Sequence, residues 1–464
     1  MGAGVSNWRL AQAVSRLGQL GVVSGTALDQ VLVRRLQDGD PDGAVRRALK
    51  AFPFRRMADR ILQTYFIAGG KAPGSPYATT PMLTQKGERG AQELCIAGNF
   101  TEIFLAREGH NNPVGINYLE KIQLPHLPSL YGAMLAGVAV VIMGAGIPMT
   151  IPSVLDALAN HQPATYPLTV SGAAATEQWC SSFTPLDFHE SQEPPAVTKP
   201  AFLPIVASNL LANVMIRKAT GPIAGFIVEG PCAGGHNAPP RGTAKFTDDG
   251  QPVYGPRDVV DLAALKAMGL PFWLAGGYGS NEQFRKALEL GATGIQVGTA
   301  FALCMESGLL PEIRQALVRK ALDGTATVRT DPLASPTGFP FKVAALEGAL
   351  SDAAIYRNRP RICNLGFLRE AYRRADGSLG YRCPAEPEAA FVAKGGEPVD
   401  TEGRVCLCNA LIANVGMPQR LRDGSTEPCL ITLGDDFSGI ARFCRNGNPD
   451  FTAADVIHTL LGVA

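Results

Sequence analysis

Residues 271–300 have the sequence PFWLAGGYGSNEQFRKALELGATGIQVGTA, and this stretch decides the fold class. Two short apolar runs, Pro271–Ala275 and Gly294–Val297, flank a segment with helical spacing, and a glycine follows each run. Continuous apolar runs bounded by turn residues are typical of parallel strands buried on both faces. The stretch therefore predicts a strand–helix–strand unit, in which Ser280 caps a helix that Asn281 opens.

Further apolar runs of the same kind lie upstream and alternate with helical segments. An alternation sustained over about 250 residues predicts an α/β fold, which we interpret as a (β/α)₈ TIM barrel with insertions. An open doubly wound sheet has the same periodicity, so periodicity alone does not separate the two. The upstream runs are Gly21–Ser24, Pro113–Asn117, Val138–Met143, Phe202–Ala207 and Ala224–Val228, and helices are expected at Trp8–Gln19 and Pro256–Met268.

Seven strands are predicted where a barrel needs eight. The chain opens with Met1-Gly-Ala-Gly-Val-Ser-Asn-Trp8, which resembles a loop that leads from a strand into a helix. We therefore expect either that the first strand is missing or that the true start lies upstream of Met1.

Two insertions and a change of composition divide the chain. Residues 28–111 and 161–200 interrupt the strand–helix alternation, and insertions of this length shape an active-site mouth or mediate oligomer contacts. Beyond about residue 355 the alternation fades and cysteines cluster. We predict a barrel domain over 1–355 and a small cysteine-containing C-terminal module over 356–464.

Composition excludes several classes of function. Lys and Arg number 42 against 41 Asp and Glu, so no net field attracts nucleic acid or an anionic membrane. The longest apolar stretch, Tyr131–Ile151, contains glycines and prolines, and we interpret it as a helix and a buried strand rather than a membrane span. No signal peptide is evident, so we expect a cytoplasmic enzyme. A homo-oligomer is compatible with the sequence.

Glycine turns follow three consecutive predicted strands. They are Glu229-Gly-Pro-Cys-Ala-Gly-Gly-His-Asn237, Ala275-Gly-Gly-Tyr-Gly-Ser280 and Val297-Gly-Thr-Ala300. The last two have the spacing of the final two units of a barrel, where loops without side chains bring backbone N–H groups to a phosphate. Glycines that only form tight turns are the alternative interpretation.

These turns resemble those of the nitronate monooxygenases and the related FMN-dependent enoyl-thioester reductases. The resemblance implies an FMN-binding TIM barrel over about residues 1–350, with His236 as the catalytic base or as the residue that orients a nitronate. The residues after His236 differ from the family's usual pattern, which leaves the substrate open. The cofactor-binding positions that the resemblance implies are Met1, Gly2, Asn117, Ser208, Gly234, Gly235, Gly276, Gly277, Gly298 and Thr299.

Three functions follow from this resemblance. The first is an FMN-dependent oxidation of nitronates, nitroalkanes or a related carbanion with O₂, in which the imidazole of His236 handles the proton. The second is an NAD(P)H-dependent reduction of an enoyl thioester. The third is a non-catalytic flavin- or metal-binding partner protein, in which residues 161–200 plug the pocket. The first two predict a small-molecule substrate.

Cysteines and carboxylates outside the glycine turns remain open to more than one interpretation. Cys363, Cys383, Cys406 and Cys408 are candidate ligands of zinc or an iron–sulfur cluster, although buried unligated thiols are at least as consistent with their spacing. Cys232 is expected to be a small buried residue rather than a nucleophile. Glu229 either binds substrate or caps a loop.

Overall fold

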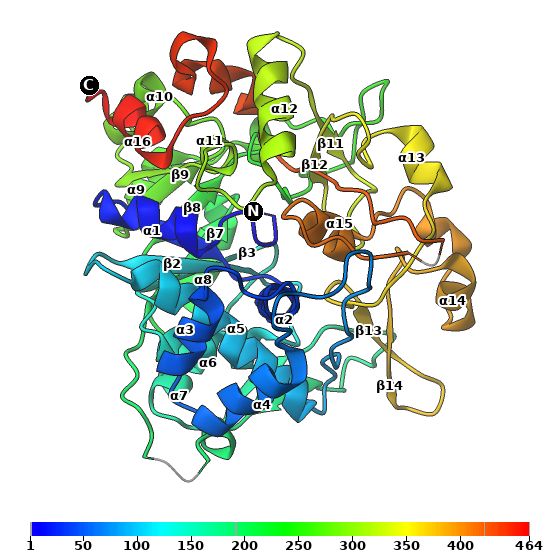
Figure 1. Cartoon of the computed structure of the whole chain (residues 1–464). Helices are drawn as coiled ribbons and strands as arrows, with labels where there is room; N and C mark the ends of the chain where they lie inside the picture. Colours follow the sequence, from blue (N-terminus) through cyan, green and yellow to red (C-terminus); the bar gives the residue numbers. More distant parts are fainter. Residues whose placement is uncertain (1, 191–192, 422, 464) are drawn as a thin grey trace.

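A computed structural model describes residues 2–190, 193–421 and 423–463. Its centre is a sheet of seven strands in the order β1-β2-β3-β7-β8-β9-β10, all paired in parallel (Figure 1). The strands are β1 (Gly21–Ser24), β2 (Val114–Leu119), β3 (Val140–Gly144), β7 (Ala201–Val206), β8 (Phe226–Glu229), β9 (Phe272–Ala275) and β10 (Gly294–Gln296).

Both faces of this sheet are apolar. In β3, Val141 and Met143 pack into the main core, whereas Ile142 faces the other way and joins an inner cluster with Leu203 and Ile227. Successive side chains of a strand alternate between faces, so a strand with helices on one side and an interior on the other is apolar at every position. This is the physical reason for the continuous apolar runs in the sequence.

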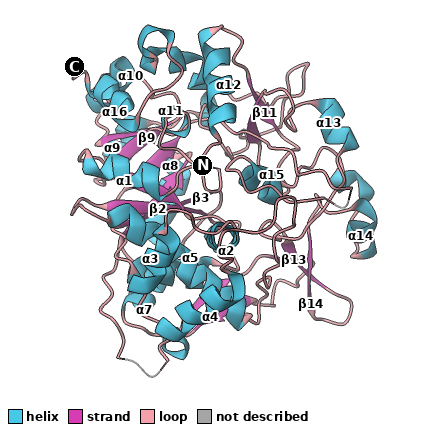
Figure 2. Ribbon diagram, in the orientation of Figure 1, coloured by secondary structure: helices cyan, strands magenta, loops and turns pink. Residues whose placement is uncertain are grey.

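Helices precede and connect the strands and cover the outer face of the sheet (Figure 2). Most expected helices form, with two differences. The helix expected at Trp8–Gln19 ends at Arg16, and the one expected at Pro256–Met268 is two short helices separated by extended backbone at Val259. The helices are α1 (Trp8–Arg16), α5 (Arg89–Arg107), α6 (His126–Leu135), α7 (Ile151–Ala159), α8 (Asn209–Lys218), η2 (Pro256–Asp258), α9 (Leu262–Lys266), α10 (Asn281–Glu289), α11 (Thr299–Ala302) and α12 (Pro311–Leu322).

The sheet is curled, but the described residues do not close it. Strands β1 and β10 are its two ends, and no pairing joins them within the described parts of the chain. The parallel α/β architecture is therefore confirmed, while a closed barrel of eight strands is not seen.

The first insertion is a helical layer against α5. It contains α2 (Leu28–Gln37), α3 (Ala44–Ala51) and α4 (Arg55–Tyr65), whose apolar side chains belong to the main core. The second insertion contains β4 (Ala164–Pro167) and β6 (Cys180–Phe183), which form an antiparallel pair, and the short strand β5 (Val170–Ser171), followed by η1 (Pro185–Phe188). Both insertions therefore fold as ordered layers.

The C-terminal residues contact distant parts of the chain. Strand β13 (Glu370–Arg373) pairs with β14 (Leu379–Arg382) on one side and with β5 on the other, at the right of Figure 1. Phe437 and Val456 share a hydrophobic core with Leu10 of α1 and Leu317 of α12. The remaining elements are β11 (Val328–Asp331), β12 (Phe341–Ala344), α13 (Ala353–Asn358), α14 (Glu388–Ala393), η3 (Pro398–Thr401), α15 (Leu407–Ala413), η4 (Asp435–Phe443), η5 (Arg445–Gly447) and α16 (Ala453–Leu461).

Within the described residues, none of the helices combines the length and the apolar character that crossing a bilayer would require.

Candidate functional site

A cavity of about 610 Å³ lies inside the curled sheet, and its lining extends from the amino ends of strands, at Gly21 and Gly294, to the turns at their carboxyl ends. Its floor includes inward-facing apolar side chains such as Ile142, Leu203 and Ile227. Its rim includes the turns that follow β8, β9 and β10. Ligands of parallel α/β folds bind at this end of the strands, so the cavity is the candidate active site.

The turn after β9 brings backbone rather than side chains to the cavity. Gly276 and Gly277 have φ of 86° and 82°, in the left-handed region that favours glycine. A Cβ on Gly276 would lie 2.9 Å from the backbone N of Ala233, in the turn after β8. Two successive glycines therefore let the turns after β8 and β9 approach each other closely.

Helix α10 begins directly after this turn. The Ser280 hydroxyl accepts a hydrogen bond from the backbone N–H of Gln283, 3.2 Å away, as expected of a helix cap. Gly277 and Gly279, which precede α10, line the cavity, and the carboxylate of Asp436 lies against Gly279, with Oδ2 2.3 Å from the position that a Cβ on Gly279 would take. A helix N-terminus beside backbone N–H groups favours an anion such as a phosphate.

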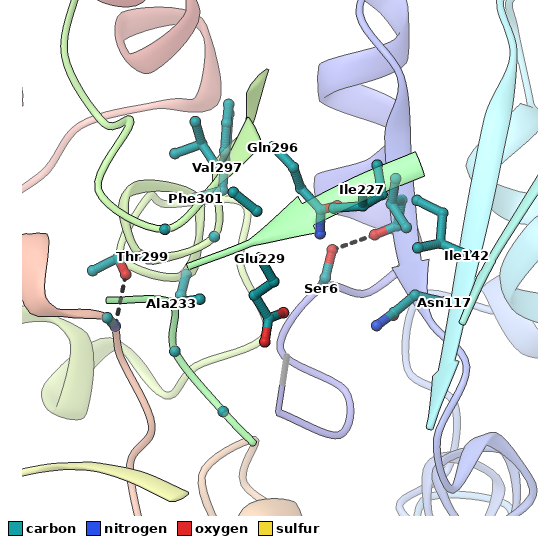
Figure 3. A pocket seen from close by; sticks show the side chains of 18 of the residues that line it. Ser6, Asn117, Ile142, Ile227, Glu229, Ala233, Gln296, Val297, Thr299 and Phe301 are labelled. Atoms are coloured by element: carbon teal, nitrogen blue, oxygen red, sulfur yellow. Dashed lines mark hydrogen bonds between the residues drawn. The ribbon is translucent and has the colours of Figure 1, made fainter. Parts of the chain in front are cut away.

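The turn after β10 leaves free space in the cavity. A Cβ on Gly298 would meet no atom within 4 Å, and Gly298 and Thr299 both line the cavity. The Thr299 hydroxyl accepts a hydrogen bond from the backbone N–H of Gly434, 2.9 Å away (Figure 3). Thr299 therefore joins the rim to the C-terminal segment, a contact that its sequence position did not predict.

The turn that contains Gly234 and Gly235 is held by residues far along the chain. The N–H of Gly235 donates to the Thr432 hydroxyl over 2.7 Å, and its carbonyl accepts from the N–H of Lys342 over 2.9 Å. A Cβ on Gly234 would lie 2.9 Å from the carbonyl carbon of Leu433. These two glycines line the cavity, and they also allow the C-terminal segment to pack against the turn.

His236 leaves this turn and lines the cavity. Its Nε2 atom is 2.7 Å from the Ser335 hydroxyl, and its ring packs edge-to-face on Phe341 at a centroid distance of 4.8 Å. Burial lowers the pKa of His236 to about 3. The imidazole is therefore neutral at neutral pH, with one ring nitrogen bonded to a serine.

Glu229 is the second titratable residue of the cavity. It ends β8, and Figure 3 shows its carboxylate between Ala233 and Ser6, directed into the cavity. Burial raises the pKa of Glu229 to about 7. A carboxyl with a pKa near the working pH is suited to proton transfer. The sequence left its role open, because its direction depends on the curl of the sheet.

Two buried amide side chains line the cavity. Asn117 in β2 and Gln296 at the end of β10 both line it, and neither Asn117 Oδ1 nor Gln296 Oε1 has a hydrogen-bond partner. A buried polar atom without a partner is costly, and such atoms in a cavity indicate that a ligand or water satisfies them. Asn117 was predicted to contact a cofactor, whereas Gln296 was missed because only its place at the strand end distinguishes it.

The remaining predicted residues divide between the cavity and other places. Gly2 lines the cavity, and Met1 lies outside the described residues. Ser208 is not part of the lining; its hydroxyl accepts from the N–H of Leu211 at 3.0 Å and caps α8. Cys232 is partly exposed and lines the cavity, and burial raises its pKa.

The four predicted metal ligands gather away from this cavity. Cys383 and Cys406 form a small buried cluster, against which Cys363 and Cys408 pack. No group of three or more His, Cys, Asp or Glu side chains in the described ranges is arranged to hold a metal ion, so zinc or an iron–sulfur cluster is not supported. The four thiols instead pack around one small buried cluster that also contains Ala385.

Comparison with known proteins supports the resemblance predicted from the turns. Residues 198–332 match the family model described as nitronate monooxygenase, and this segment contains His236 and the turns after β8, β9 and β10. A nitronate monooxygenase of Pseudomonas aeruginosa is 37% identical over 129 residues, which are 27% of this chain and 32% of that protein. A probable nitronate monooxygenase of Bacillus subtilis is 35% identical over 92 residues, which are 20% of this chain and 25% of that protein.

The match to these relatives thus spans about a third of their length or less. Among solved structures, nitroalkane oxidase of Streptomyces ansochromogenes aligns with a TM-score of 0.48 at 16% identity, covering 100% of this chain and 92% of that one. FabK of Thermotoga maritima aligns with a TM-score of 0.46 at 16% identity, covering 99% and 89%. The family resemblance is confirmed for the segment with the three turns, and it makes the chain similar to oxidoreductases.

Proposed function

We propose that this chain is an FMN-dependent oxidoreductase of the nitronate monooxygenase type, which oxidises a nitronate, a nitroalkane or a related carbanion with O₂. One observation carries the proposal: the turns after β8, β9 and β10 face one cavity, and the first of them also contains His236. The family match covers the same three turns.

The cavity fits FMN by its chemistry. Gly277 and Gly298 provide backbone without side chains beside the N-terminus of α10, and a phosphate that binds there would displace the Asp436 carboxylate from Gly279. Asn117 and Gln296 bring amide groups to the cavity lining, and amides both donate and accept hydrogen bonds, as a polar ring system requires. When bound there, FMN would supply the electron acceptor for the oxidation.

Glu229 and His236 have different parts in the proposed reaction. The Glu229 carboxylate, with its pKa near 7, accepts the proton from the carbon beside a nitro group. The pKa of His236 is too far below neutrality for an efficient base, so its imidazole stays neutral and offers its free ring nitrogen to the substrate. The sequence assigned the proton to His236; we now place it on Glu229 and keep His236 as the residue that orients the substrate.

The apolar lining of the cavity favours one alternative function, the reduction of an enoyl thioester. Leu10, Val14, Ile457 and Leu460 extend the cavity wall beyond the inner face of the sheet. A small nitronate would leave most of this surface uncovered, whereas the acyl chain of an enoyl thioester would cover it. An NAD(P)H-dependent enoyl-thioester reductase is therefore the second candidate. For the non-catalytic alternative, no described residue of 161–200 lines the cavity, so nothing in those residues plugs it.

The test begins with the visible absorbance spectrum of the purified full-length chain. We expect a flavin spectrum, and mass spectrometry of the released cofactor should identify FMN. A colourless protein that takes up neither FMN nor FAD in equilibrium dialysis would overturn the flavin proposal.

Anaerobic reduction then separates the two enzyme candidates. Loss of flavin absorbance on addition of an alkyl nitronate, with no change on addition of NADH or NADPH, supports an enzyme of the nitronate monooxygenase type. Rapid loss of flavin absorbance on addition of NADPH or NADH, followed by its recovery on addition of an enoyl thioester, supports the enoyl-thioester reductase. This result would overturn the proposal of a nitronate monooxygenase type.

A further inference from the structure

A short segment near the C-terminus, residues 432–442, forms hydrogen bonds with all three glycine turns of the candidate site, and we call it the clasp. Two of its bonds hold the turn after β8. The Thr432 hydroxyl accepts from the N–H of Gly235 at 2.7 Å. The N–H of Asp435 donates to the carbonyl of Cys232 at 2.9 Å. The first part of the clasp therefore has a fixed position against this turn.

The clasp also bonds the turns after β9 and β10. The N–H of Gly434 donates to the Thr299 hydroxyl at 2.9 Å, in the turn after β10 (Figure 3). The Arg442 guanidinium donates from Nη1 to the carbonyl of Gly279 at 2.6 Å, in the turn after β9. Since these bonds lie on both sides of Asp436, they determine where its carboxylate can reach.

The carboxylate of Asp436 lies at the turn that we assign to the FMN phosphate. Asp436 lines the cavity, and its Oδ2 atom lies close to the position that a Cβ on Gly279 would take. Its Oδ1 atom is buried and has no hydrogen-bond partner among the described residues. Gly279 directly precedes Ser280, the cap of the nine-residue helix α10. Because the first turn of a helix attracts anions, a carboxylate and a phosphate compete for the same place.

The cations of the clasp do not neutralise this carboxylate through an ion pair. The Lys342 ammonium pairs with the neighbouring Asp435 at 2.6 Å and leaves Asp436 out. The Arg442 guanidinium is bonded to the Gly279 carbonyl. A phosphate that enters the turn would therefore meet a carboxylate of like charge.

We propose that Asp436 is a specificity-determining residue of the flavin site, whose carboxylate competes with the phosphate of FMN and weakens the binding of phosphorylated relative to unphosphorylated flavins. This inference rests on the proposed function, because it concerns the phosphate of the proposed cofactor. Like charges repel most strongly where water is excluded, so FMN binds only when the Asp436 side chain moves away from Gly279. Riboflavin has no phosphate and meets no such competition. FMN is consequently an exchangeable cofactor of this protein.

The test measures the affinity of the flavin-free, full-length chain for FMN and for riboflavin by fluorescence titration. Asp436→Asn removes the charge and keeps the shape of the side chain, and Asp436→Ala removes the whole carboxylate. We expect both variants to bind FMN at least about tenfold more tightly than the unchanged protein, and to bind riboflavin within about twofold of it. Two variants are used so that poor folding of one does not decide the result.

Glu282→Gln is the matched control. Glu282 lies in the first turn of α10, so the variant removes one negative charge near the same end of the helix. The Glu282 side chain is exposed and lies outside the cavity lining. We expect the affinities of this variant for FMN and riboflavin to equal those of the unchanged protein.

Inorganic phosphate is a second probe, which does not require flavin binding. Thermal unfolding is compared in sodium phosphate and in sodium chloride of equal ionic strength. A ligand that binds the folded state raises the melting temperature. We therefore expect phosphate to raise the melting temperature of Asp436→Asn more than that of the unchanged protein or of Glu282→Gln.

Four outcomes would overturn this proposal. They are an unchanged or weaker FMN affinity in both Asp436 variants, an equal gain for riboflavin, an equal gain in Glu282→Gln, or the same effect of phosphate on all the proteins. Absence of any flavin binding in every variant would instead overturn the proposed function, and the phosphate measurement would still decide the competition by Asp436.

Discussion

The hydroxyl of Ser335 lies 2.7 Å from Nε2 of His236, although the two residues are 99 positions apart in the sequence. Ser335 is fully buried and follows the strand β11, so the bond links the turn after β8 to the C-terminal part of the chain. This relationship determines which ring nitrogen of His236 remains available to a ligand in the cavity.

Replacement of Ser335 by alanine should lower kcat by about tenfold and change KM much less, because the loss of one orienting hydrogen bond costs about 1.4 kcal/mol in the transition state. Steady-state kinetics with the compound that reduces the flavin in the anaerobic test measures both constants. Thr337→Val is the matched control, since Thr337 bonds the Ser335 hydroxyl at 2.8 Å but does not bond His236. An equal loss in both variants would mean that the loop, rather than the orientation of His236, determines the rate.

Replacement of Gly298 by valine should weaken FMN binding by at least about tenfold, or 1.4 kcal/mol, and leave the melting temperature of the flavin-free protein unchanged. Gly298 has a φ of −113°, and a Cβ there meets no atom within 4 Å, so the new side chain fills cavity space rather than straining the backbone. Fluorescence titration with FMN measures the effect. Gly255→Val is the control, because Gly255 has a φ of −132°, also has open space at its Cβ position and lies outside the cavity lining. Unchanged FMN affinity in Gly298→Val would place the phosphate elsewhere.

Glu229 should produce a limb in the pH profile of kcat/KM. Its carboxyl, with the pKa raised by burial to about 7, is a base only when ionised, so activity on a nitroalkane should rise as the pH increases through about 7. Glu229→Gln should remove this limb and lower the plateau by about a hundredfold or more, in line with the loss of a general base. Glu282→Gln, on the exposed side of the first turn of α10, should keep the limb. If the same limb persists in Glu229→Gln, another group accepts the proton.

The contribution of Glu427 to the stability of the protein should fall as the pH rises from about 4.5 to about 7, which is measured as the difference in slope between the unchanged protein and Glu427→Gln. Burial raises the pKa of Glu427 from 4.5 to about 7, so in this range the folded state retains a proton that the unfolded state has released. The stabilisation is therefore complete below 4.5 and is lost as the pH rises through 7. Urea unfolding of the flavin-free protein across this range measures the slope. Glu427→Gln should reduce it, and an identical slope in the variant would show that Glu427 does not cause it.

Arg359 and Glu427 form a buried ion pair, with 2.8 Å between Arg359 Nη2 and Glu427 Oε1 and with 2% and 0% of their side chains exposed. Arg359→Met should destabilise the fold by about 3–5 kcal/mol, because it leaves a buried carboxyl without its partner. The double variant Arg359→Met, Glu427→Leu should recover most of that loss. Thermal unfolding of the three proteins measures both effects. A double variant as unstable as Arg359→Met alone would assign the loss to packing rather than to the unpaired charge.

The strand positions were predictable because each parallel strand contacts apolar surroundings on both faces. Pro271–Ala275 in the sequence became β9 (Phe272–Ala275), and Gly294–Val297 became β10 (Gly294–Gln296). The same reasoning found the two glycine turns, because a close approach of backbone to a ligand excludes a Cβ. Ser280 was also predicted correctly as the cap of α10.

Other parts of the site depend on contacts that no local pattern reports. Ser208 resembled a cofactor ligand by its place after a strand, but its hydroxyl caps α8 instead. Ser335, Thr432 and Gly434 hold the turns of the site from positions about a hundred or more residues away. The clustering of cysteines after residue 355 left a metal site and unligated thiols open, and the fold packs the four thiols around one buried cluster without a metal-holding arrangement among the described residues.

The sequence by itself determined the parallel α/β architecture and the glycine turns, since both follow from short-range rules of burial and backbone conformation. Only the tertiary structure decided the direction of Glu229, the partner of His236 and the packing of Cys363 and Cys408 against Cys383 and Cys406. These features depend on how segments far apart in the chain pack. The packing determines both how far each side chain is removed from water and which side chains it contacts. The pKa values near 3 for His236 and near 7 for Glu229 are consequences of that packing.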